Sequence, residues 1–195
     1  MPTAQDVALY SGPRPSRARR WAPWVVAVSA GLALCNVAML VLNLVERGYQ
    51  QQRISGSPPP SECIRETLDS LHTIGNVSSV AALAFLVLGV TWSAKRRTRA
   101  RVAEEGETGV EPRLRSVNPS VYWTFWAALA ASFALALVAR SKVHVGMTAE
   151  DFVGYRSYLA ATNGARAVMW ASWVALVIFA TRLQDRRETE SVSPE

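Results

Sequence analysis

Residues 24–45 read WVVAVSAGLALCNVAMLVLNLV and contain no charged side chain. A helix of this length rises about 33 Å, which matches the hydrocarbon core of a bilayer, roughly 30 Å thick. A soluble helix of this length normally keeps a charged face toward water, and this stretch has none. The stretch therefore predicts a transmembrane helix, in preference to a buried helix of a soluble bundle.

The rest of the 195-residue chain repeats this pattern. Half of all residues are apolar, and most gather in four blocks of roughly 20 residues, each long enough to span a bilayer. The predicted spans are 22–45, 73–94, 120–139 and 157–181. The sequence thus predicts an all-α membrane protein, a four-transmembrane-helix bundle whose single membrane domain covers residues 21–185.

The positive charges predict how this bundle is oriented. Of the 21 Lys and Arg side chains, fourteen lie in the two tails and the middle connection, and six lie in the two other connections. Because Lys and Arg mark the cytoplasmic side, we expect both termini inside (N-in/C-in) in a multi-pass protein of the cell (plasma) membrane. The basic clusters at 14–20 and 95–101 adjoin predicted spans, so they do not indicate a nucleic-acid partner.

The segments between and around the spans are polar. Residues 1–20 contain four Arg and no apolar period, which predicts a disordered basic cytoplasmic tail, and residues 186–195 form a second cytoplasmic tail. The tract SGSPPPSE at 55–62 cannot continue a helix. We expect Asn118 or Ser120 to cap the third helix, and Thr148 with Asp151 to form a capping box that starts the fourth helix well before its span.

Small residues recur on two of the predicted spans. Ala27, Gly31 and Cys35 follow one another at four-residue spacing on the first. Ala127, Ala131 and Ala134 lie on one side of the third. Since small side chains let helices approach closely, we expect both stripes to be helix-packing surfaces.

No pattern of residues predicts catalysis. The chain has no phosphate-binding glycine loop, no Cys-x-x-Cys or His-x-x-x-His pair and no serine elbow. The two histidines, His72 and His144, are too few for a haem pair or for a zinc site with histidine ligands alone. We therefore expect no metal, no cofactor and no enzymatic activity.

Polar residues recur at helical spacing within three spans. Ser29, Asn36 and Asn43 repeat every seven residues, which places them on one helical face with Glu46. Similar spacings occur on the second and fourth spans, and the predicted directions bring six polar residues into the outer half of the bilayer. The resulting candidate ligand-binding residues are Asn43, Glu46, His72, Asn76, Asn163 and Arg166.

Arg166 is the most informative of the six, because ionised side chains within spans are rare and usually face the interior. It precedes Arg182 by sixteen residues, or about 24 Å, so it lies about 6 Å below the outer edge of the hydrocarbon core. Three roles remain open for it: an anchor that snorkels to the interface, an ion pair with Glu46, or a ligand contact.

The chain also resembles a known family in the order of these features. The second span closes on TWSAKRRTRAR (91–101), and the last span closes on VIFATRLQDRRE (177–188). In this it is similar to a family of bacterial, mainly actinobacterial, four-span membrane proteins known as domain of unknown function 4328. The resemblance covers about residues 22–188 and implies the four-span architecture, but no activity.

Two functions are compatible with these expectations. The first is a non-enzymatic accessory or scaffold subunit that lies in the lipid bilayer and assembles through its transmembrane helices with a second copy or another membrane protein. The alternative is a component that binds or transports a small ligand or a lipid headgroup through the outward-facing polar cluster.

Overall fold

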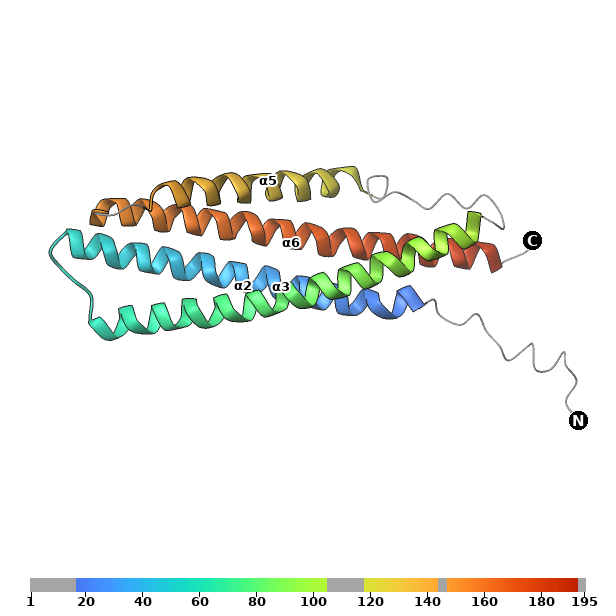
Figure 1. Ribbon diagram of the computed structural model, residues 1–195, viewed down its shortest axis with the longest axis horizontal. Coiled ribbons are helices and arrows are strands. Elements are labelled where there is room, and N and C mark those ends of the chain that lie inside the picture. The colour runs from blue at the N-terminus through green and yellow to red at the C-terminus, as the bar shows by residue number, and fades with distance from the viewer. Residues whose placement is uncertain (1–16, 105–117, 144–146, 193–195) are drawn as a thin grey trace, which may run out of the picture.

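The computed structural model describes residues 17–104, 118–143 and 147–192. The described chain forms four α-helices, α2 (Arg17–Ile54), α3 (Ser61–Glu104), α5 (Pro119–Ser141) and α6 (Ala149–Val192). They run alternately up and down, so the start of α2 and the end of α6 lie at one end of the molecule (Figure 1). The opposite end, where α2 leads to α3 and α5 to α6, is called the hairpin end below.

The helices extend beyond the predicted spans. The backbone of α2 is already helical at Arg17, inside the tail predicted for residues 1–20, and α6 continues to Val192 through most of the tail predicted for 186–195. Arg, Ala and Glu are good helix formers, so a helix anchored by its apolar part continues through such residues. The tail predictions for residues 1–16 and 193–195 lie outside the described residues.

The predicted helix boundaries at the caps are confirmed. The Asn118 side chain accepts a hydrogen bond from the Val121 backbone N–H at 3.2 Å, so Asn118 caps α5 and Ser120 does not. The Asp151 backbone N–H donates to Thr148 Oγ1 at 3.1 Å, and the Thr148 backbone N–H donates to Asp151 Oδ2 at 3.0 Å. Gly56 has a φ of 80°, a conformation that glycine adopts without strain, and it follows the end of α2.

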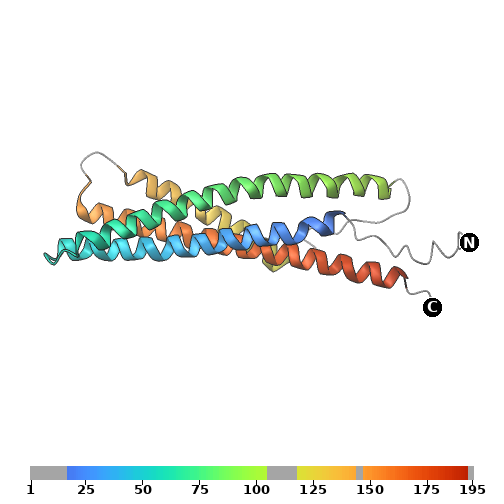
Figure 2. The same cartoon turned by 90° about the horizontal axis from the view of Figure 1, so that it is seen from below.

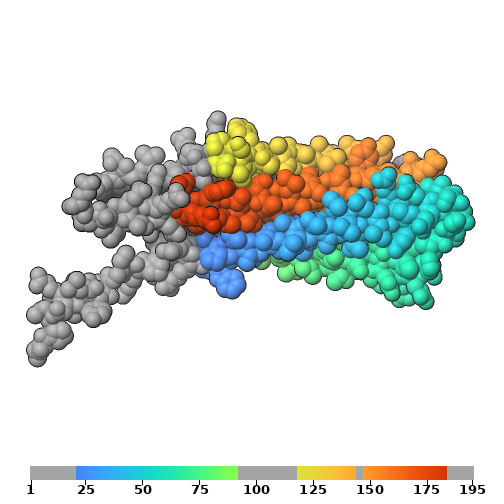
Figure 3. All heavy atoms as spheres, turned by 180° about the vertical axis from the view of Figure 1, so that it is seen from behind, coloured from blue at the N-terminus to red at the C-terminus, as the bar shows by residue number. Residues whose placement is uncertain are grey.

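The four helices form an open row. In the described chain, backbones approach closely between α5 and α6, α6 and α2, and α2 and α3, whereas α3 and α5 have no close backbone approach. Seen from behind, α6 and α2 lie in the middle with α5 and α3 at the edges (Figure 3). Figure 2 shows the second half of α3 running apart from α6. The helix pair α2–α6 therefore holds the two hairpins together.

Apolar side chains cover much of the outer surface. Each of the four helices is long and apolar enough to cross a membrane, as predicted. None of the residues in the most apolar 18-residue window of α3 is buried. The exposed large apolar residues of α3 include Val77, Val80, Leu83, Leu86, Val87 and Val90. An apolar surface of this extent is characteristic of a protein surrounded by lipid or by other protein.

The buried face of α2, in contrast, carries polar residues among the apolar Ala22, Val25 and Leu32. Ser29, Asn36, Asn43 and Glu46 are all buried, with at most 4% of each residue exposed. The first three each donate a side-chain hydrogen bond of 2.7 Å to the carbonyl oxygen four residues earlier in the same helix. A buried polar group is costly when it lacks a partner, and these three bonds give each side chain one partner within α2 itself.

Gly164 of α6 lies directly against α2. A Cβ atom added to Gly164 would lie 2.9 Å from Leu40 Cδ1, closer than side-chain contacts allow. A Cβ added to Gly31 of α2 would meet nothing within 4 Å. Gly164 therefore leaves the space that the end of the Leu40 side chain occupies.

We expect Gly164→Leu to lower the free energy of unfolding by about 1–3 kcal/mol, because the added side chain overpacks the α2–α6 contact. Gly31→Leu is the matched control and should change it by less than about 0.5 kcal/mol, as substitutions in open space do. Unfolding by SDS in mixed micelles measures both values. Equal destabilisation by the two substitutions would contradict this packing.

Candidate functional site

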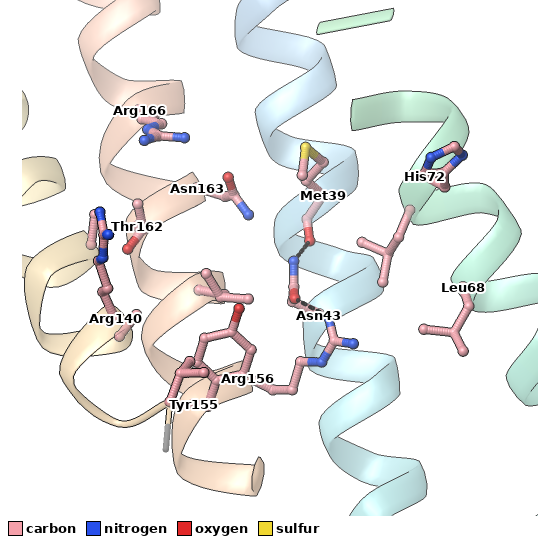
Figure 4. A pocket seen from close by; sticks show the side chains of 15 residues that line it. Met39, Asn43, Leu68, His72, Arg140, Tyr155, Arg156, Thr162, Asn163 and Arg166 are labelled. Carbon is pink, nitrogen blue, oxygen red and sulfur yellow. Dashed lines mark hydrogen bonds between the residues drawn. The ribbon is translucent and has the colours of Figure 1, made fainter. Parts of the chain in front are cut away.

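A pocket of about 580 Å³ lies between the four helices, in the half of the molecule nearer the hairpin end. All four helices contribute to its lining, with α6 contributing the largest share (Figure 4). Its polar lining residues are Asn43 of α2, His72 of α3, Arg140 of α5, and Tyr155, Arg156, Thr162, Asn163 and Arg166 of α6.

Four of the six predicted ligand-binding residues line this pocket. Asn43 and Asn163 are buried, while His72 and Arg166 are exposed. Glu46 and Asn76 are not among the lining residues. Residues from three helices that are far apart in the sequence thus meet at one site.

The sequence analysis missed two of the three arginines, Arg140 and Arg156. Each lies one residue outside a predicted span, and both were counted as connection residues. The structure shows Arg140 within α5 and Arg156 within α6. The missed signal was spacing, because Arg156 precedes Asn163 by seven residues and Arg166 by ten, which places all three on one face of a helix.

Arg156 is held in place from two sides. Its Nη1 donates a hydrogen bond of 3.1 Å to Asn43 Oδ1, which ties α6 to α2. Its guanidinium carbon lies 5.0 Å from the centroid of the Phe152 ring, within cation–π range. The Asn43 side-chain amide in turn donates to the Met39 carbonyl oxygen. Figure 4 shows Arg156 extending from α6 toward Asn43. The guanidinium is therefore fixed at the edge of the pocket.

The positive charges of the pocket are not balanced by carboxylates. None of its lining residues in the described chain is acidic. Among the described residues, no carboxylate forms an ion pair with Arg140, Arg156 or Arg166, so the ion pair between Arg166 and Glu46 that the sequence left open is not formed. Glu46 Oε1 instead accepts a hydrogen bond of 3.0 Å from Gln50 Nε2.

An aromatic cluster lies on the other side of Arg166 from Arg156. The ring centroids of Phe85 in α3 and Trp170 in α6 are 4.7 Å apart. Those of Phe125 in α5 and Trp173 in α6 are 5.6 Å apart. These four residues, the aromatic cluster, join both edge helices to α6 through large side chains, although the backbones of α3 and α5 remain apart.

The predicted packing stripes do not lie in the contacts between these helices. Ala27, Ala127, Ala131 and Ala134 are exposed, and Gly31 and Cys35 are half-buried. The small residues of α5 that are buried against α6 are Ala128, Ser132 and Ala139. In the described part of the chain, no group of three or more His, Cys, Asp or Glu residues is arranged to hold a metal ion.

Comparisons of this chain with protein-family models, curated proteins and solved structures found no match. Its resemblance to the four-span family of domain of unknown function 4328 stays a prediction.

Proposed function

We propose that this protein crosses the cell membrane four times, with both termini in the cytoplasm, and serves as a non-enzymatic component that binds a negatively charged ligand. The ligand is a small anion or a lipid headgroup, and its site is the pocket lined by Arg140, Arg156 and Arg166. The four long apolar helices and the distribution of Lys and Arg support the membrane part of this proposal.

The observation that carries the binding part is the gathering of three arginines in one pocket without an acidic partner. A guanidinium is always charged, and its planar set of donors fits carboxylate and phosphate oxygens. Like charges brought together in a partly apolar site repel one another, and an anionic ligand relieves that repulsion while forming strong charge-assisted hydrogen bonds. An anion is therefore the ligand that this lining fits best.

Binding is a better fit to this lining than catalysis. The Thr162 hydroxyl donates its hydrogen bond to the Tyr158 carbonyl oxygen at 2.8 Å, so it is not activated by a neighbouring base. A nucleophile within hydrogen-bond reach of a base is the usual requirement for covalent catalysis.

A second candidate function is lateral assembly as an accessory or scaffold subunit. The observation that favours it is the exposure of Ala127, Ala131 and Ala134 along one side of α5, the helix at the edge of the row. Exposed small residues allow the helix of another subunit to approach closely in a membrane.

The proposed orientation is tested by cysteine labelling in a Cys35→Ser, Cys63→Ser background. Glu62→Cys, near the hairpin end, should react with a membrane-impermeant maleimide in intact cells, because that end is proposed to face outward. Ser120→Cys, at the start of α5, should react only after the cells are permeabilised. The reverse pattern would contradict the orientation.

Anion binding is tested by thermal unfolding of the protein in a neutral detergent with inorganic phosphate, glycerol 3-phosphate or phosphatidic acid. At about ten times its Kd, a ligand of the pocket should raise Tm by roughly 3–6 °C. Arg156→Gln should weaken binding by about tenfold or more, because it removes a charge-assisted hydrogen-bonding group. Arg65→Gln, at an exposed site of α3, is the matched control and should bind as the original protein does. A Tm unchanged by all three anions would remove the proposal.

Assembly is tested by cross-linking in native membranes followed by mass spectrometry. If the exposed side of α5 is an interface, Ala131→Trp should abolish cross-links from α5 to a second copy or another membrane protein, since the larger side chain keeps the helices apart. Phe133→Trp alters a different exposed side of the same helix and should leave the cross-links unchanged. A chain that forms no cross-links before substitution excludes this second function.

A further inference from the structure

We infer that the ligand of the pocket is a phosphate ester of a lipid, whose acyl chains leave the pocket sideways through the opening between α3 and α5. This inference rests on the proposed function and goes further by naming the ligand class and its path. It follows from the opening between the edge helices, the charged and apolar side chains of the lining, and the depth of two of the arginines.

The opening is a consequence of the row of helices. Both α3 and α5 line the pocket, but in the described chain their backbones never approach closely, so nothing from the backbone closes the space between them. Farther along α6, Phe85 of α3 and Phe125 of α5 contact the tryptophans of the aromatic cluster. In this inference a long ligand leaves the pocket between α3 and α5, on the hairpin side of the aromatic cluster.

The lining contains both charged and apolar side chains. Two of the three arginines come from α6, in the middle of the row, and the third, Arg140, comes from α5. The edge helices also contribute apolar side chains, Leu68 and Leu71 from α3 and Ala136 and Ala139 from α5. A small inorganic ion gains no binding energy from contact with apolar side chains. An amphiphile with an anionic head against α6 and hydrocarbon chains between α3 and α5 matches both kinds of side chain.

Two of the arginines lie on either side of the depth at which lipid phosphates are found. With the hydrocarbon core beginning at Arg182, Arg166 lies about 6 Å inside its far edge. Arg156 precedes Arg166 by ten residues, about 15 Å along the helix, and so lies roughly 9 Å outside that edge. The headgroup layer is about 5–7 Å thick on each side of a bilayer, so the lipid phosphates lie between these two arginines.

Phosphate is the anion that fits a site with three arginines best. A phosphate ester offers several acceptor oxygens, which arginines from different directions can share, whereas a single carboxylate offers two. Arg140 is close to the end of α5 and reaches the pocket from the side opposite α3. A phosphate anchored by its chains in the same hydrocarbon is also present at a high effective concentration beside the pocket.

The test compares three probes on the full chain in mixed micelles of a neutral detergent: phosphatidic acid, its soluble headgroup analogue glycerol 3-phosphate, and zwitterionic phosphatidylcholine. Displacement of a fluorescent phosphatidic acid gives each affinity. We expect phosphatidic acid to bind at least about tenfold more tightly than glycerol 3-phosphate, and phosphatidylcholine to bind at least about tenfold more weakly than phosphatidic acid.

The chain path is tested by filling the opening. Ala136→Trp adds bulk to the α5 wall and should weaken phosphatidic acid binding by at least about tenfold more than it weakens glycerol 3-phosphate binding. Ala130→Trp, exposed on the same helix and outside the pocket lining, is the matched control and should change neither affinity. Leu71→Trp adds the same bulk from α3 and repeats the test if Ala136→Trp does not fold.

The outcomes separate this inference from the proposed function. Equal affinity for phosphatidic acid and glycerol 3-phosphate, or equal weakening of both by Ala136→Trp, would overturn the lipid path while anion binding stands. Tight binding of phosphatidylcholine would overturn the role of net negative charge. If neither phosphate-bearing probe binds, both the inference and the proposed function are wrong.

Discussion

The close packing of α2 against α6 is the contact on which the other features depend. Gly164 leaves room for Leu40 where a Cβ atom would lie too close, and the backbones of α2 and α6 run near each other and join the two hairpins. Because both middle helices already have two neighbours, α3 and α5 are left at the edges of the row. The pocket is the space that remains between these edges, on the hairpin side of the aromatic cluster.

The helices of this arrangement carry apolar side chains on the outside and a mixture of apolar and polar side chains between them. Leu34 and Val37 of α2 face outward, while Ser29, Asn36 and Asn43 face the other helices. In lipid there is no hydrophobic drive that buries apolar side chains between helices, so close packing and hydrogen bonds take over that role. The bond from Arg156 to Asn43 is one such contact between α6 and α2, and it lies next to the pocket that both helices help to form.

The sequence predicts where the helices lie better than it predicts which of their faces are buried against other helices. The absence of charge over a bilayer's thickness identifies α2, and side-chain capping chemistry locates the starts of α5 and α6. Arg156 was missed because hydropathy marks where a span ends, whereas the helix that carries the residue continues. On α5, alanines lie on every side, so sequence spacing alone cannot tell whether Ala127 or the adjacent Ala128 faces α6. Only the packing of α5 on α6 decides that Ala128 is buried.

The hydrogen bonds within α2 bear on how such a protein is made. The two hairpins, α2–α3 and α5–α6, approach closely through the backbones of α2 and α6 and also touch where Phe85 of α3 contacts Trp170 of α6. If the protein crosses a membrane as proposed, the α2–α3 hairpin is synthesised before α6 and would enter the bilayer before α6 exists. Ser29, Asn36 and Asn43 each already donate a hydrogen bond to a carbonyl oxygen of their own helix, which lowers the cost of placing these polar side chains in lipid before α6 arrives. The polar face thus permits stepwise biogenesis, in which two hairpins insert in turn and dock afterwards.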